Sequence, residues 1–118
     1  MPDMTHSQFE ALLGRQTSEL TEDVTTTYER YRVAPARMRH QWRFDGREVA
    51  APVWVVARDG SSVLGYDEVE EEWGIGLARA GVMEGEVVED WGTFGANLRW
   101  ALLHFPTPRY QADEQPGT

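Results

Sequence analysis

The stretch YDEVEEEWGIGLARAGVMEGEVVEDWGTFGANLRWALLHF, residues 66–105, joins the densest acidic run of the chain to its clearest helical pattern. Its apolar residues are interrupted by glycines, which is typical of short strands separated by tight turns. We therefore expect strands over residues 73–78 and 86–91. A helix that begins at Thr93 should follow, because apolar residues recur at helical spacing until Pro106.

The sequence before this stretch alternates between apolar and polar residues, a pattern that is typical of half-buried strands. The pairs Asp45-Gly46 and Asp59-Gly60 predict hairpin turns, because both residue types tolerate positive φ. The strands that these turns separate should cover residues 37–44, 49–58 and 62–69.

The run VWVVA, residues 53–57, is apolar throughout and predicts a strand that is buried on both faces. Trp54 lies in this run, so we expect it in the core, where truncation to alanine costs about 3–5 kcal/mol. The other four tryptophans are expected to be mostly core residues too. One or two of them would be exposed anchors of an interface, where tryptophan is favoured.

Two helices are expected near the N-terminus. Thr5 is a candidate N-cap of the first, which Gly14 would end, and Ser18 is a candidate N-cap of the second. Three consecutive β-branched threonines weaken the second prediction, so a strand over residues 25–33 is the alternative. Pro35 should end whichever element precedes it.

Together these patterns predict an α+β fold. We expect an antiparallel meander of about five strands, with an N-terminal helix or helices and a C-terminal helix packed on one face. Residues 1–106 should form a single domain. Residues 107–118 are polar and contain proline and glycine, so they should form a mobile tail.

The composition limits the classes of partner. The chain of 118 residues has a net charge of −9, so phosphates would repel it, which argues against nucleic acid and anionic membranes. It has no cysteine, no apolar run near the roughly 20 residues of a membrane span, and no N-terminal pattern of a signal peptide. We expect a cytoplasmic protein without a cofactor. Its charge permits a basic protein as partner, and its oligomeric state is left open.

The acidic residues of the central stretch are candidates for a docking surface. If the two acidic runs form adjacent strands, their carboxylates converge on one patch that would bind a basic partner protein. The alternative is a solvated strand edge that prevents aggregation. The candidate partner-binding residues are Asp67, Glu68, Glu70, Glu71, Glu72, Glu86, Glu89 and Asp90.

A small metal-dependent hydrolase is the alternative function. It would use carboxylate oxygens to hold Mg²⁺ or Ca²⁺, but the chain has no metal-binding motif. The carboxylates that could serve it are Asp67, Glu70, Glu71 and Asp90. Catalysis by histidine lacks support, since no nucleophile motif accompanies the three histidines. His40 is expected as a core or rim residue, and Gly74 and Gly76 should let the sheet bend or bulge.

The layout resembles that of small bacterial immunity proteins of toxin systems, among them the Smi1/Knr4-like group. The residues that carry the resemblance are Trp73-Gly74, Asp90-Trp91-Gly92 and the predicted helix over 94–105. They lie in the C-terminal half of the chain. The resemblance implies a non-enzymatic protein that binds one toxin through an acidic face.

Overall fold

The two longest strands of the chain are joined by a two-residue turn. Its residues, Asp45 (φ 52°) and Gly46 (φ 74°), are both in the left-handed region. Such a turn has the twist that its flanking strands require. The hairpin predicted at this Asp-Gly pair is therefore confirmed, between strands β1 (Arg32–Phe44) and β2 (Arg47–Asp59).

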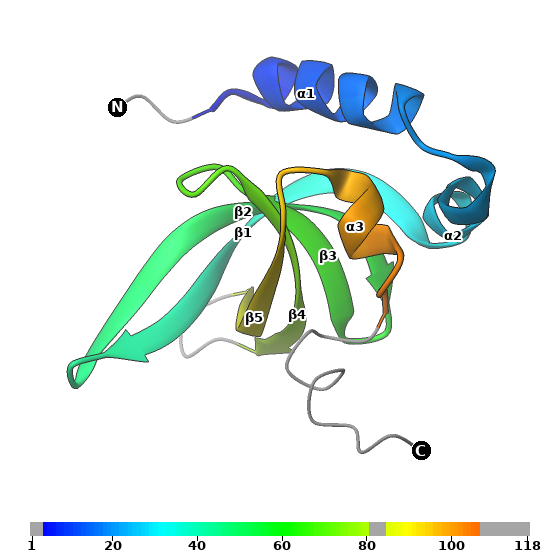
Figure 1. The fold of residues 1–118 in the computed structure, drawn as a ribbon. Helices are drawn as coiled ribbons and strands as arrows, with labels where there is room; N and C mark the ends of the chain where they lie inside the picture. The colour runs from blue at the N-terminus through cyan, green and yellow to red at the C-terminus, as the bar shows by residue number, and fades with distance from the viewer. Residues whose placement is uncertain (1–3, 81–84, 107–118) are drawn as a thin grey trace.

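The computed structural model describes residues 4–80 and 85–106 (Figure 1), and the predicted tail, residues 107–118, lies outside them. The fold is α+β, as predicted, and no helix in the described part is long and apolar enough to cross a membrane. The remaining elements are α1 (His6–Ser18), α2 (Glu22–Tyr31), β3 (Ser62–Asp67), β4 (Glu72–Ala80), β5 (Glu86–Gly95) and α3 (Leu98–Leu102).

The five strands form a closed barrel in the order β1-β2-β3-β4-β5. Each consecutive pair is antiparallel, which confirms the meander. The expectation of an entirely antiparallel sheet is wrong at the closure, where β1 and β5 pair in parallel through Arg39↔Val87 and His40↔Val88. An odd number of alternating strands leaves the first and last in the same direction, so closure of this meander requires a parallel pair.

The N-terminal helices differ from the prediction in their bounds. Thr5 caps α1 in a capping box with Gln8, as expected, but α1 passes through Gly14. The predicted second helix is confirmed as α2, but Ser18 does not cap it, because Ser18 is the last residue of α1 and the N-cap of α2 is Thr21. Pro35 does not end an element. It lies within β1, where the register with β2 shifts, as is typical of proline in a sheet.

The C-terminal helix is shorter than predicted. Thr93 belongs to β5, because it pairs with Gly74 and the ladder continues to Gly95. Helix α3 therefore begins only at Leu98, and the predicted helix over 94–105 is wrong at both ends. Phe105 is buried nevertheless, in the turn that follows α3.

Two apolar clusters lie on the two faces of the sheet. The outer cluster joins Phe9 of α1, Val24 of α2 and Leu98 of α3 to side chains of β2, β3 and β4, so all three helices pack on one face. Trp54 belongs to it, is buried as predicted, and stacks on Phe9 with ring centroids 4.9 Å apart. The second cluster, built around Val53 and other small side chains, fills the barrel interior.

Glycines in β4 make room for a tryptophan in the barrel. A Cβ atom at Gly74 would lie 2.5 Å from ring atoms of Trp91, and one at Gly76 would lie 2.5 Å from Val88 Cγ1. The ladder between β4 and β5 shifts register next to both glycines, which confirms the expected bulges. Trp91 thus occupies the space that two side chains would otherwise take.

Candidate functional site

Asp67, the last residue of β3, fixes the turn into β4. Its Oδ1 accepts hydrogen bonds from the backbone N–H groups of Val69 (2.9 Å) and Glu70 (3.1 Å), and its carbonyl oxygen accepts one from Glu71 N–H (2.8 Å). Glu71 has a φ of 58°, which a residue with a side chain seldom adopts. We call residues 69–72 the acidic turn. Its conformation is set by the buried aspartate beneath it.

The second carboxylate oxygen of Asp67 faces a histidine inside the barrel. Oδ2 lies 3.3 Å from Nε2 of His40, and both side chains are buried. Burial alone would raise the pKa of Asp67, but its contact with His40 and the hydrogen bonds from the N–H groups of Glu70 and Val69 lower it below its ordinary value. The carboxylate is therefore ionised at neutral pH.

His40 is also the middle ring of an aromatic stack. Its ring centroid lies 4.5 Å from that of Trp42 and 5.4 Å from that of Trp91, with near-parallel planes in both cases. Phe44 continues the same face of β1, because side chains two residues apart in a strand point to the same side. We call Trp91, His40, Trp42 and Phe44 the aromatic row. It runs from the barrel interior outward along the hairpin.

The inner end of the aromatic row contains unsatisfied polar atoms. Both the Nδ1 of His40 and the Nε1 of Trp91 are buried without a hydrogen-bond partner among the described residues. The Nε2 of His40 has only the contact with Asp67, which is too poorly aligned to count as a hydrogen bond. Each such group costs about 1–3 kcal/mol of desolvation. Two of them in one stack are unusual for a core that serves packing alone.

The outer end of the aromatic row is exposed. Trp42 is 40 % accessible and Phe44 is 69 % accessible. The β1–β5 pairing ends at His40 and the β2–β3 pairing begins at Val53, so residues 41–51 have no further strand beside them in the described structure. We call residues 41–51 the distal hairpin. Figure 1 shows it projecting beyond the other strands at the lower left.

Most of the predicted partner-binding carboxylates are paired within the chain. These contacts join Asp67 to His40, Glu68 to Arg37, Glu86 to Arg58, and both Glu89 and Asp90 to Arg79. The remaining three, Glu70, Glu71 and Glu72, belong to the acidic turn and make no ion pair with any described residue. The acidic turn is therefore the part of the predicted docking surface whose charge is free.

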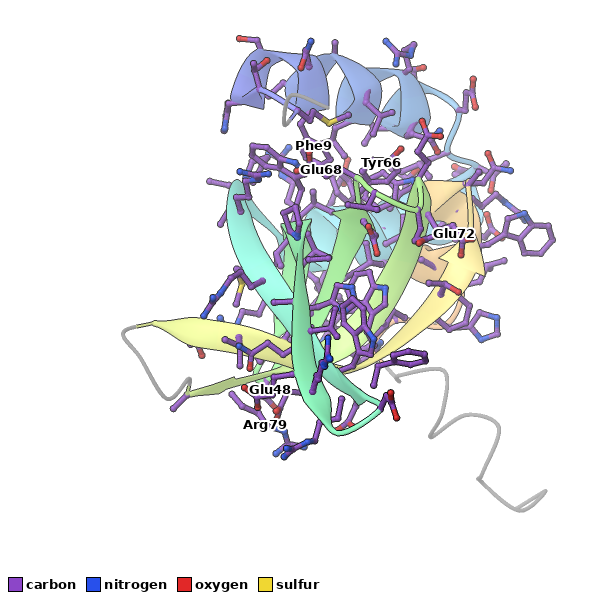
Figure 2. The ribbon with its side chains drawn as sticks, turned by 90° about the vertical axis from the view of Figure 1, so that its left-hand side faces the viewer. Phe9, Glu48, Tyr66, Glu68, Glu72 and Arg79 are labelled. Atoms are coloured by element: carbon purple, nitrogen blue, oxygen red, sulfur yellow. The ribbon has the colours of Figure 1, made fainter. Side chains whose placement is uncertain are left out.

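Glu68 is a structural residue. Its side chain is only 8 % exposed and accepts hydrogen bonds from the N–H of Met4 (2.8 Å), from Arg37 (2.8 and 3.1 Å) and from Trp54 Nε1 (3.2 Å). It ties the segment before α1 to β1 and β2. Figure 2 shows it below Phe9, on the helix side of the sheet.

The two acidic runs do not converge on one patch. Strand β4 lies between β3 and β5, and its register places Glu72 opposite Asp67 but Ala80 opposite Glu86. At about 3.3 Å per residue, the carboxylates of β5 lie roughly 15–25 Å along β4 from the acidic turn. Figure 2 shows Glu72 and Arg79 well apart, near the two ends of β4. The predicted single patch is wrong because the strands that carry it are not neighbours.

The acidic turn instead adjoins the aromatic row. Asp67 and Glu72 are directly opposite in the β3–β4 ladder, so their side chains share the face that carries His40. Val69 adds an apolar side chain that is 65 % exposed. Asp67 lies opposite Val53 of β2, whereas Trp42 lies opposite Val49, so the exposed aromatic side chains begin roughly 13 Å along β2 from the acidic turn. The buried contact between Asp67 and His40 connects the two surfaces. Together, the aromatic row and the acidic turn are the candidate functional site.

The carboxylates proposed for a metal are not gathered. Within residues 4–80 and 85–106, no group of three or more His, Cys, Asp or Glu side chains is arranged to hold an ion. Asp90, with a φ of 55° at a bulge of β5, contacts Arg79 and not the acidic turn. Of the histidines, His6 contacts Glu10 and His104 stacks on Phe94.

Sequence reasoning missed the aromatic row as a functional surface. The alternation from Met38 to Phe44 was expected to mark a half-buried strand, which is correct only as far as His40. The sequence did contain one signal of this exposure. A hairpin at Asp45-Gly46 places Trp42 and Phe44 opposite residues 47–49, and these precede the apolar run at residues 53–57. Comparisons of the chain with known protein families, with curated proteins and with solved structures find no match.

Proposed function

We propose that this chain is a non-enzymatic binding protein that captures a partner protein on the aromatic row and the acidic turn. The observation that carries the proposal is the exposure of Trp42 and Phe44 on a projection that nothing else in the described structure covers. Exposed aromatic side chains cost free energy in water, and tryptophan is enriched where interfaces derive most of their affinity. A partner that covers the row would recover that free energy.

The acidic turn defines the charge of the partner. Glu70, Glu71 and Glu72 make no ion pair with the residues that the structure describes, and the Asp67 hydrogen bonds hold their backbone in place. A basic surface on the partner would be attracted over about 8–10 Å and would bind a preorganised loop. The proposed partner therefore offers apolar side chains to the aromatic row and basic side chains to the acidic turn.

An inhibitor or immunity protein of a toxin system is the kind of binding protein that we propose. Such a protein needs a preformed surface and no reactive group. Two observations favour this role over catalysis. His40 is covered on both ring faces by tryptophans, and the neighbouring carboxylate of Asp67 accepts hydrogen bonds from the backbone of the acidic turn. No observation favours the metal-dependent hydrolase.

A photo-reactive amino acid at position 44 tests the proposal in the native cells. We expect it to cross-link one protein specifically, whereas the same group at Glu29, on the exposed side of α2, should not. The captured protein is then purified and its binding kinetics are measured. Loss of the row in Trp42→Ala/Phe44→Ala should mainly speed dissociation.

The acidic turn has its own test. The triple variant Glu70→Gln/Glu71→Gln/Glu72→Gln should slow association, and salt should affect it less than it affects the wild type. The matched control removes three exposed carboxylates of the helical side, Glu19, Glu22 and Glu29. Equal association rates for both triple variants would mean that net charge alone matters. The acidic turn would then have no role in recognition.

A further inference from the structure

Strand β1 has a free edge along the distal hairpin. On that side its neighbour is β5, but the two strands pair only at Arg39↔Val87 and His40↔Val88. From Gln41 to Phe44, no described strand pairs with β1 on the side opposite β2. Main-chain N–H and C=O groups on such an edge are available to pair with another extended segment.

The turn geometry identifies which main-chain groups face the edge. A two-residue turn makes its flanking residues, Phe44 and Arg47, a hydrogen-bonded pair. Such pairs alternate with non-bonded ones, so the N–H and C=O groups of Gln41 and Arg43 point away from β2. The position of Pro52 supports this assignment. Pro52 lies opposite Arg39 in a non-bonded pair, where the β1–β2 ladder does not use the N–H group that proline lacks.

We infer that the partner docks by adding a strand to this edge, through the main-chain groups of Gln41 and Arg43. The inference rests on the proposed function and assigns one extended segment of the partner to this edge, separate from the basic side chains that would face the acidic turn. One face of the added strand would lie along Trp42 and Phe44, and the other along the exposed arginines Arg39 and Arg43. The segment that fits therefore alternates apolar and acidic side chains, because these complement the aromatic face and the arginine face.

Two other arrangements fit less well. A second copy of this chain, added antiparallel at the same edge, would bring Arg39 and Arg43 close to the same arginines of the first copy, and like charges directly opposite are destabilising. The outer edge of β2 is interrupted by Pro52, which cannot donate a hydrogen bond. The edge of β1 is thus the better acceptor, and a foreign strand is the better occupant.

A short peptide that alternates glutamate and valine serves as the probe. We expect it to bind the wild-type protein and to slow hydrogen exchange of the amides of Gln41 and Arg43. The control peptide has the same sequence with N-methyl groups on alternate residues, which removes the donors that face β1. Equal binding of both peptides, or protection elsewhere in the chain, would overturn strand addition.

Variants of the protein give a second, independent readout. Arg43→Pro removes an edge N–H without removing a bond of the β1–β2 ladder, and Arg43→Ala is its control for lost charge. The proline variant should bind the probe, and the cross-linked partner, about tenfold more weakly than the alanine variant. Gln41→Pro and Gln41→Ala repeat the comparison in case Arg43→Pro does not fold.

The outcomes separate the two proposals. If position 44 cross-links a partner but proline and alanine variants bind it equally, the proposed function survives and strand addition is wrong. If position 44 cross-links nothing, the proposed function fails. Light scattering of the protein without peptide tests the alternative occupant, since a dimer that the probe dissociates would assign the edge to a second copy.

Discussion

Oδ2 of Asp67 lies 3.3 Å from Nε2 of His40, across the inside of the barrel. This contact joins the two halves of the candidate site. The other oxygen of Asp67 accepts the hydrogen bonds of the acidic turn, and the ring of His40 stacks on Trp42 in the aromatic row. A residue that connects two surfaces in this way should affect both when it is changed.

Asp67→Asn should destabilise the protein, by about 1–3 kcal/mol at neutral pH, because an amide oxygen is a weaker acceptor than a carboxylate for the N–H groups of the acidic turn. The pKa of Asp67 is lower in the folded protein than its ordinary value of 3.8. Its contribution to stability is therefore complete above that value, and it is lost as the pH falls through the lower folded pKa. Urea unfolding of wild type and variant across this range checks the prediction. A difference that grows as the pH falls would contradict it.

Gly74→Ala should destabilise the fold by overpacking. The added methyl group would lie 2.5 Å from the Trp91 ring and 2.7 Å from the carbonyl oxygen of Gly92, and a backbone atom cannot move aside cheaply. We expect a loss of about 1–3 kcal/mol. Gly14→Ala in α1 is the matched control, since nothing lies within 4 Å of its new atom, and it should stabilise by about 0.5–1 kcal/mol. Thermal melting of both variants decides. Equal shifts would show that Trp91 does not fill the space beside Gly74.

Glu68→Ala should be the most destabilising substitution among the acidic residues of the 66–72 region other than Asp67. It removes the acceptor of Trp54 Nε1 and of the Met4 N–H, and one of the partners of Arg37, at a cost of about 2–3 kcal/mol. Glu70→Ala, two residues away and exposed, should stay within about 0.5 kcal/mol of the wild type. Chemical denaturation measures both. If the two variants lose the same free energy, Glu68 is a surface carboxylate after all.

Mg²⁺, Mn²⁺ and Ca²⁺ should leave the melting temperature unchanged beyond an ionic-strength effect. Specific binding of an ion would stabilise the folded state in proportion to the logarithm of its concentration. The carboxylates of the described residues do not gather into a group that would hold one. A saturable shift with any of the three ions, absent with matched NaCl, would revive the hydrolase.

Local patterns predicted the elements better than their assembly. The Asp-Gly turns, the apolar run around Trp54 and the meander follow from neighbouring residues, and all are present. Closure of the barrel rests on two residue pairs between β1 and β5, which no local pattern marks. Thr93 was assigned to a helix because Phe94 begins a helical spacing, yet pairing with β4 keeps both residues in β5. Tertiary pairing overrides a short periodic signal in such cases.

Only the acidic residues of the candidate site were singled out from the sequence. The glutamates of the acidic turn were expected at a docking surface, and they make no ion pair within residues 4–80 and 85–106. The contact between Asp67 and His40 joins residues from different strands, so sequence spacing could not show it. The same is true of Arg58, Arg37 and Arg79, which neutralise carboxylates that looked free in the sequence. An alternating pattern also does not show where the neighbouring strands end. Trp42 is exposed because β5 and β3 do not extend beside the distal hairpin.

The affinity of Trp42→Ala for the protein that cross-links through position 44 tests the central claim most directly. The matched control is Trp100→Ala on α3, because Trp100 is 51 % exposed and Trp42 is 40 % exposed. If the aromatic row is the binding surface, Trp42→Ala should weaken binding at least about 30-fold, as expected for an interface hot spot, and Trp100→Ala should bind like the wild type. Equal affinities for both variants, or a loss only with Trp100→Ala, would contradict the assignment of the site.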